Sequence, residues 1–186
     1  SHHSKSVGLT GIIKRGHYVS ERLLCAQLGT APPVPPEDPA SAQNFKTDRE
    51  RVSAQTAPAA CAGCHLKLLN PLGFAFENLG PAGKWRTVEA SGSGGAINAV
   101  DAYSFDDSDT LNFDGAVTLM KKLTERVELH QCYVKKIVEA LYGRSVDASD
   151  ANLIGDLGEA SLQGMSTKDL FIEILSNNQM TLRSNQ

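Results

Sequence analysis

Two cysteines and a histidine stand together in this chain, in the stretch Cys61-Ala62-Gly63-Cys64-His65. Residues three apart share one face of a helix, so the two thiols are expected to lie side by side if the stretch is helical. His65 follows Cys64 directly, and adjacent helical residues point about 100° apart. The cluster is compatible with a zinc site, a redox dithiol or a covalently attached haem.

The zinc and dithiol alternatives are disfavoured by their surroundings. The divergence of Cys64 and His65 makes a single ion hard to reach, and a structural zinc site needs a fourth ligand. The residues available to complete such a set are Cys25, Cys132, His17 and His130, and none of them shows a paired ligand spacing. A thioredoxin-like dithiol is expected in a βαβ setting, whereas these flanks are predicted to be helical and Pro-rich.

The haem alternative fits the spacing directly. In Cys-x-x-Cys-His, two thioethers reach the vinyl groups at one porphyrin edge and the next residue places its imidazole under the iron. Ala62 and Gly63 are small enough to let the ring approach the backbone. We therefore expect one haem c per chain, attached through Cys61 and Cys64 with His65 as the proximal iron ligand.

Charge and composition exclude several other classes. The 186 residues carry a formal net charge of −3, and scattered Lys and Arg give no basic field for nucleic acid. No apolar run approaches the ~18 residues of a membrane span. Residues 1–7 are expected to be a tag remnant and residues 8–186 a single haem-binding domain. Only 6% of residues are aromatic, so a large apolar cofactor would help to fill the core.

The pattern of apolar residues, caps and breakers predicts a mainly α fold, with roughly six helices around one haem. A Pro-rich extended arm is expected over 30–45, and Asn70-Pro71 is expected to end the helix that carries the cluster. A long irregular segment should follow to residue 113, with short β-strands near Val88 and 97–100. The predicted helices lie within 8–29 and over about 47–57, 58–69, 114–124, 128–142, 149–162 and 166–175. Leu24 and Leu28 are expected on the apolar face of the first helix, Gly143 is expected to end the helix over 128–142, and Ser149 and Ser166 are expected to cap the last two helices.

Further motifs accompany the cluster in a fixed order. Asn-Pro-Leu-Gly-Phe-Ala-Phe-Glu-Asn-Leu stands at 70–79 and Gly-Lys-Trp-Arg at 83–86, with KRGHYVSERLLC and APPVPP upstream and CYVKKIVEALYGR and DLFIEILSNNQMTLR downstream. From about residue 11 to 183, this order resembles the planctomycete-type cytochrome c domains, domains of unknown function in large secreted bacterial proteins. The resemblance implies a cytochrome c-like helical fold and a haem protein outside the cytoplasm, without implying a known reaction.

Residue roles follow from the haem assignment and the resemblance. Leu72 and Phe74 are expected to line the haem pocket, a role hardly distinct from core packing. Trp85 and Arg86 are candidates to hold the haem propionates, because an indole N–H and a guanidinium both suit carboxylates. A solvated surface pair is the alternative for these two residues.

The same assignment bears on the remaining cysteines. Haem c is attached outside the cytoplasm, where disulfides form. We therefore expect a Cys25–Cys132 disulfide, which would close a loop of about 107 residues and stabilise the fold by ~2–4 kcal/mol. Two separate buried thiols are the alternative.

The sixth iron ligand is the least determined part of the site. Met180 is the first candidate, Met165 the second and His17 the third, and an open site is a further alternative. Met120 and His130 lie inside helical patterns and are expected to be core or surface residues.

The function expected from these features is mono-haem electron transfer in the periplasm or outside the cell, with a redox partner protein. A larger secreted parent protein is expected, and a link to extracellular redox or polysaccharide metabolism follows by analogy alone. One alternative is a haem enzyme with peroxidase-like activity at an open distal site, using His17 or His130 as the acid–base group. A zinc-dependent interaction module is the other.

Overall fold

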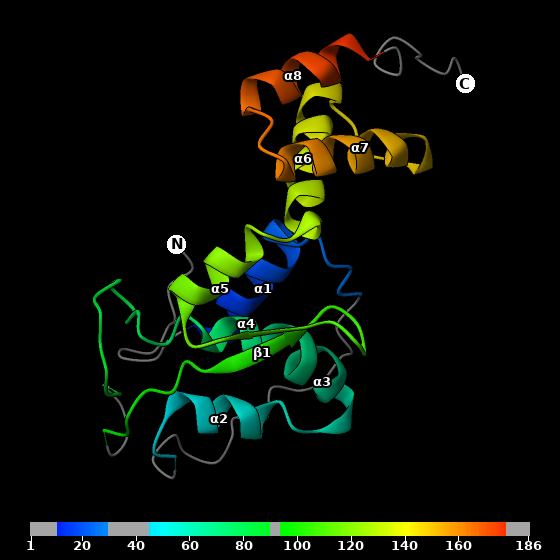
Figure 1. The fold of residues 1–186 in the computed structure, drawn as a ribbon. Helices are drawn as coiled ribbons and strands as arrows, with labels where there is room; N and C mark the ends of the chain where they lie inside the picture. Colours follow the sequence, from blue (N-terminus) through cyan, green and yellow to red (C-terminus); the bar gives the residue numbers. More distant parts are fainter. Residues whose placement is uncertain (1–10, 30–44, 90–93, 178–186) are drawn as a thin grey trace. The chain divides into compact units, whose positions relative to one another are not determined.

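The structure is a computed structural model that describes residues 11–29, 45–89 and 94–177. Met180 and nearly all of the predicted Pro-rich arm lie outside these residues. The fold is mainly helical with one small sheet, as expected (Figure 1). The elements are α1 (Ile12–Tyr18), η1 (Val19–Leu23), α2 (Asp48–Gln55), α3 (Ala59–Cys64), η3 (His65–Leu69), α4 (Asn70–Phe74), β1 (Asp101–Ser104), β2 (Thr110–Phe113), α5 (Ala116–Leu123), α6 (Val127–Tyr142), η4 (Ala148–Asp150), α7 (Ala151–Leu162) and α8 (Thr167–Ser176).

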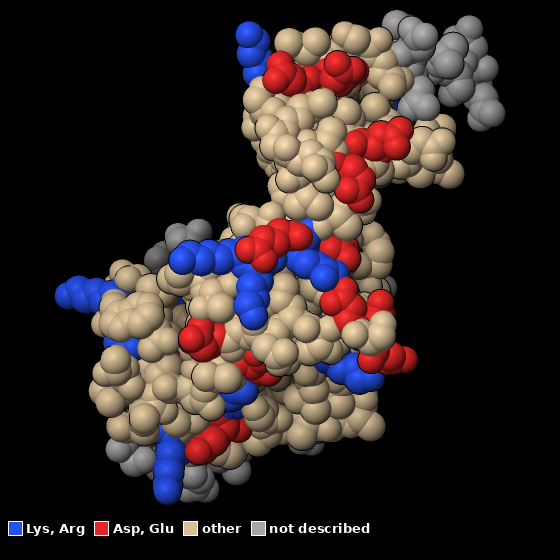
Figure 2. Space-filling model, viewed as in Figure 1, with Lys and Arg blue, Asp and Glu red and all other residues tan. Residues whose placement is uncertain are grey.

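The chain divides into two compact units. Unit 1 consists of Ser1–Arg22 and Ala26–Lys121, and unit 2 of Leu23–Cys25 and Lys122–Gln186. Whether the two units behave as the single domain expected from the sequence stays a prediction. On the face of unit 1 drawn in Figure 2, Lys and Arg side chains are mixed with Asp and Glu side chains.

Unit 1 is organised around the contact of α1 with α4, and β1 lies against the other side of α4 (Figure 1). Two glycines make the helix contact close. A Cβ atom on Gly16 would overlap the carbonyl oxygen of Leu69, and one on Gly73 would overlap that of Ile12. The helix that follows the Cys61–His65 cluster is therefore held against α1 backbone to backbone.

The N-terminal helix is shorter than the spacing of apolar residues predicts. The α-helical and π-helical turns end at Leu23, and Cys25 has a left-handed φ of 52°. A residue in this region cannot continue a right-handed helix. Leu24 and Leu28, which were expected on the apolar face of this helix, lie beyond its end.

The prediction that Asn70-Pro71 ends the cluster helix is wrong. Helical structure continues through α4 to Phe74, and all of its residues are buried. The preceding turn η3 is π-helical, so α4 starts a new hydrogen-bonding pattern at Asn70. Pro71 then lies in the first turn, where its missing N–H leaves no bond unmade.

The sheet is a hairpin of β1 and β2, in which Asp101 pairs with Phe113 and Ser104 with Thr110. Val88 forms only an isolated bridge with Ala96, and residues 97–100 precede the strand instead of forming it. Arg49 on α2 explains this. Its Nη1 donates to the carbonyl oxygens of Asn98 and Val100 at 3.0 Å each. These two carbonyls therefore accept from a side chain instead of from the N–H groups of a neighbouring strand.

Unit 2 contains α6, α7 and α8 around one apolar core. Gly143 ends α6 in a left-handed conformation, as predicted, and the Ser166 hydroxyl caps α8 by accepting from the Asp169 N–H. The cap before α7 is Asp147, not Ser149, because η4 intervenes. The buried core residues are Val134, Ile137, Val138, Leu157, Leu170 and Ile174.

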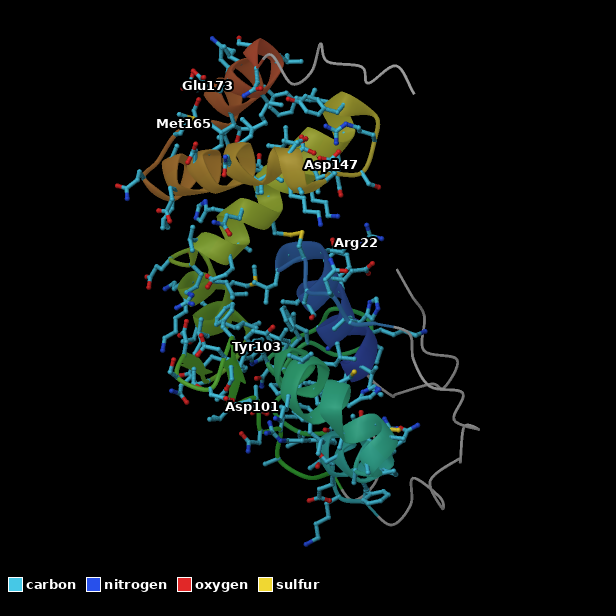
Figure 3. The ribbon with its side chains drawn as sticks, turned by 90° about the vertical axis from the view of Figure 1, so that its right-hand side faces the viewer. Arg22, Asp101, Tyr103, Asp147, Met165 and Glu173 are labelled. Carbon is cyan, nitrogen blue, oxygen red and sulfur yellow. A yellow bond between two sulfur atoms is a disulfide. The ribbon has the colours of Figure 1, made fainter. Side chains whose placement is uncertain are left out.

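Cys25 and Cys132 form a disulfide within unit 2, with a Cα–Cα separation of 5.4 Å (Figure 3). The bond confirms the predicted pairing and excludes the alternative of two separate thiols. It ties the segment after α1 to the middle of α6.

Candidate functional site

The cysteine–histidine cluster is positioned by two consecutive helical segments of different kinds. Pro58 begins α3, and its carbonyl accepts from the Cys61 and Ala62 N–H groups at 2.8 and 2.9 Å. Both cysteines lie on α3, and the π-helical η3 begins at His65. The change of helix type therefore falls between the last thiol and the imidazole.

The two thiols are free and accessible. Cys61 is half-buried and Cys64 exposed, and neither takes part in a disulfide. Cys64 Sγ lies 3.9 Å from the Leu28 carbonyl oxygen. A Cβ atom on Gly63 would meet no atom within 4 Å, so this position of α3 is not packed against another element.

The imidazole of His65 has an unusual environment. The residue is half-buried, and its Nδ1 atom is buried without a hydrogen-bond partner. Buried polar atoms are nearly always paired, so an orphaned ring nitrogen calls for an explanation. A histidine that binds a metal through Nε2 uses Nδ1 as a second, supporting contact. The cluster therefore fits a haem in two respects, free thiols on one helix and an imidazole beside them.

The donor atoms of the cluster do not converge on one point. Among the described residues, the only metal-capable group whose donor atoms all lie within 4.8 Å of one another is Asp48, Glu77 and Glu89. Cys61, Cys64 and His65 are not such a group. This divergence, which the adjacency of Cys64 and His65 predicts, argues against a single zinc ion at the cluster.

The acidic group itself was missed by the sequence analysis. All three carboxylates are buried, and each has an arginine partner. Arg86 Nη1 lies 2.8 Å from Glu89 Oε2, and Arg86 Nη2 lies 3.5 Å from Glu77 Oε2. The remaining pairs are Arg51 Nε with Asp48 Oδ1 at 3.5 Å and Arg15 Nη1 with Glu77 Oε1 at 4.0 Å. Three cations balance three carboxylates, so we assign the group a structural role and no metal ion.

Burial is the main cause of the pKa shifts of two residues in this charged group, Glu89 and Arg15. Burial raises the pKa of Glu89, while the hydrogen bond from the Asp48 N–H and the charge of Arg86 act in the opposite direction. Burial likewise lowers the pKa of Arg15, against the charge of Glu77. Glu77 and Arg86 belong to the motifs at 70–79 and 83–86, but nothing in their spacing shows that they are buried together.

The residues predicted to line a haem pocket have different surroundings. Leu72 is fully buried, and Phe74 packs with Ile12 and Val52 beneath the Arg49 guanidinium, which lies 4.2 Å from the ring centroid. Trp85 is 66% exposed, whereas Arg86 is occupied by the two buried glutamates. Contact of these four residues with a haem stays a prediction.

The candidates for the sixth iron ligand are spread over the chain. His17 is exposed at the end of α1, with Nδ1 3.5 Å from Glu21 Oε2. Met165 packs against the apolar core of unit 2 (Figure 3). Met120 is half-buried in α5, and Met180 lies outside the described residues. The identity of the ligand stays a prediction.

His130 is fully engaged in unit 2. Its Nδ1 lies 2.8 Å from Ser161 Oγ and its Nε2 lies 3.0 Å from the Thr124 carbonyl oxygen. These two contacts join α6 to α7 and to the loop before α6. A structural role accounts for both ring nitrogens.

No helix in the described part of the chain combines the length and apolar character that crossing a membrane requires.

Comparison with known proteins gives one match. A family model described as "PSCyt3: Protein of unknown function (DUF1588)" matches residues 2–89. The family name indicates a cytochrome c-type domain of the planctomycete kind, and the matched range includes the cluster and both following motifs. No curated protein and no solved structure matches the chain. The resemblance of the segments after residue 89 stays a prediction.

Proposed function

We propose that the chain is a mono-haem c-type cytochrome domain that transfers electrons in the periplasm or outside the cell. The observation that carries the proposal is the arrangement of the cluster, with two free thiols on α3 and an imidazole whose donor atoms do not converge with them. A porphyrin spans such a spread of donors, whereas one ion does not. The family name supports the same class of protein.

The roles of the three residues follow from their chemistry. Cys61 and Cys64 each add their thiol across one vinyl group, so that a C–S bond forms, the thiol proton goes to the vinyl group and nothing leaves. His65 supplies the proximal nitrogen ligand. When bound, the haem iron takes up and releases one electron. The Cys25–Cys132 disulfide supports an oxidising compartment, which is where haem c is attached.

The main test is covalent haem content. The full chain should be matured with the bacterial c-type haem machinery and denatured, and its pyridine haemochrome spectrum recorded. We expect one thioether-linked haem per chain, and none in Cys61→Ala/Cys64→Ala. A parent protein without covalent haem would overturn the proposal.

Electron transfer is favoured over peroxidase-like catalysis by the described histidines. His130 has both ring nitrogens engaged, and His17 is an exposed side chain paired with Glu21. We expect a low-spin ferric spectrum that does not change at low concentrations of cyanide or peroxide, and a high-spin spectrum that shifts would favour the enzyme.

A further inference from the structure

Two buried polar atoms lie one helical turn apart in the segment that carries the cluster. His65 Nδ1 and Asn70 Oδ1 are both buried and have no hydrogen-bond partner. The Asn70 backbone N–H donates to the His65 carbonyl across η3, so the two residues begin and close the same π-helical turn. Single π turns inside helices are frequent at functional sites. Two buried atoms without partners at the two ends of one such turn are candidates to form a hydrogen bond with each other.

The orientation of the Asn70 amide is fixed by its neighbours. Its Nδ2 donates to Thr56 Oγ1 at 2.8 Å, and the Thr56 hydroxyl donates to the Val52 carbonyl oxygen at 2.7 Å. A hydroxyl that has given its proton to Val52 can only accept from the amide. The NH₂ group therefore faces Thr56, and the atom left over is the acceptor Oδ1. Asn70 and Thr56 are 1% and 3% exposed, so water cannot easily satisfy that oxygen.

The chemistry of the two atoms is complementary. A histidine that binds a metal through Nε2 keeps its proton on Nδ1, and this N–H needs an acceptor. His65 Nδ1 would be such a donor, and it is buried away from water. Asn70 Oδ1 is an acceptor without a donor.

We propose that Asn70 is the positioning residue of the axial imidazole, with its Oδ1 accepting the hydrogen bond from His65 Nδ1–H when His65 Nε2 is bound to the haem iron. The two atoms do not bond to each other in the structure, so binding of Nε2 is expected to turn the ring toward Asn70. Thr56 holds the NH₂ group of the amide, so Oδ1 is the amide atom that remains available to accept this hydrogen bond. This inference rests on the proposed function.

The hydrogen bond has a definite effect on the iron. An acceptor on Nδ1–H makes the imidazole a more basic ligand, which favours the ferric state and lowers the reduction potential. Loss of the acceptor should raise the potential. A carboxylate in its place should lower it further.

The test compares Asn70→Val and Asn70→Asp with the parent in the full, haem-loaded chain. The readouts are the midpoint potential and the NMR resonance of the His65 Nδ1 proton in the ferrous state. We expect the potential to rise in the order Asn70→Asp, parent, Asn70→Val. Each tenfold change in the relative affinity for the two oxidation states would move it by about 59 mV. The Nδ1 proton should exchange faster with solvent in Asn70→Val.

Asn78→Val is the matched control. Asn78 Nδ2 donates to the Arg86 carbonyl at 3.0 Å, so this variant also loses one amide hydrogen bond of the same segment. It should leave both readouts at the parent values. A potential that shifts equally in Asn78→Val and Asn70→Val would overturn the proposal, because the effect would then be structural.

Two further outcomes are decisive. The Asn70→Asp variant keeps the size of the side chain, and Thr56 can turn its hydroxyl to the carboxylate because the Val52 carbonyl retains the Thr56 N–H at 3.0 Å. If Asn70→Val does not fold, a potential of Asn70→Asp at or above the parent value overturns the proposal. A parent without covalent haem instead defeats the proposed function, and the haemochrome assay reveals this separately.

Discussion

Arg86 joins two buried carboxylates in unit 1. Its guanidinium contacts Glu89 and Glu77, which are 5% and 1% exposed. Removing one partner of a buried ion pair typically costs about 3–5 kcal/mol, because the remaining charge is left uncompensated. We expect Arg86→Met to lose about that much free energy of unfolding, measured by urea titration.

Arg22→Met is the control for this substitution, because Arg22 is exposed and its Nε lies 3.7 Å from the exposed Glu21. An exposed pair contributes only about 0–1 kcal/mol. Equal losses in the two variants would contradict the structural role of Arg86.

The free energy of unfolding of Arg86→Met should also depend on pH differently from that of the parent. Burial raises the pKa of Glu89 above the ordinary value of 4.5, so the folded state holds this proton more tightly than the unfolded state. The stabilisation that comes from protonated Glu89 is therefore fully present below the pKa of the unfolded state. It is lost as the pH rises through the higher pKa of the folded state. The positive charge of Arg86 lowers the pKa of Glu89, so this pKa should be higher in Arg86→Met than in the parent. The difference in free energy of unfolding between variant and parent should therefore become smaller from pH 7 toward pH 4.5.

The residues differ in how far they could be predicted. The spacing of Cys61, Cys64 and His65 predicts a cofactor site, and the adjacency of Cys64 and His65 predicts that their donor atoms diverge. The charged group of Glu77, Glu89 and Arg86 could not be found in this way, because charged residues are exposed by default and only the tertiary fold buries them together. The burial of Asn70 Oδ1 without a hydrogen-bond partner could not be predicted from the sequence for the same reason.

Helices and their ends show a similar division. Gly143 and Ser166 mark helix ends through their own backbone and side-chain chemistry, and both predictions are confirmed. The continuation of the cluster helix through Pro71 depends on a π turn, and the early end of the N-terminal helix depends on the conformation of Cys25. Those features are backbone conformations that the local pattern of apolar residues, caps and breakers does not specify.

The close contact of α1 and α4 leads to a prediction for its glycines. In Gly16→Ala and Gly73→Ala, the added Cβ meets a backbone carbonyl that cannot turn aside as a side chain would. Overpacking of this kind costs about 1–3 kcal/mol. We expect both variants to unfold at lower urea concentration than the parent.

Gly155→Ala in α7 is the control for the glycine variants, because a Cβ there meets no atom within 4 Å. Alanine is favoured over glycine in a helix interior by about 0.5–1 kcal/mol. This variant should therefore be at least as stable as the parent. A Gly16→Ala protein as stable as Gly155→Ala would show that α1 does not need its close approach to α4.

For the whole molecule, the four cysteines divide into two pairs with separate tasks. Cys25 and Cys132 are joined, whereas Cys61 and Cys64 remain thiols. Under the proposed function, one pair stabilises the fold and the other attaches the cofactor. The proposal requires this division, because in an oxidising compartment one pair would form the disulfide and the other would react with the haem.

Crossed substitutions test this division. We expect Cys25→Ser/Cys132→Ala to lose about 2–4 kcal/mol of stability while keeping covalent haem, because the bond mainly restricts the unfolded chain. Alanine is used at Cys132 because the site is 3% exposed and a hydroxyl there would be buried. Cys61→Ala/Cys64→Ala should keep the disulfide and contain no covalent haem. Thermal unfolding with and without reductant, beside the haemochrome assay, measures both properties. Reductant should lower the melting temperature only where Cys25 and Cys132 are intact, and loss of haem from Cys25→Ser/Cys132→Ala would show that the two tasks are not separate.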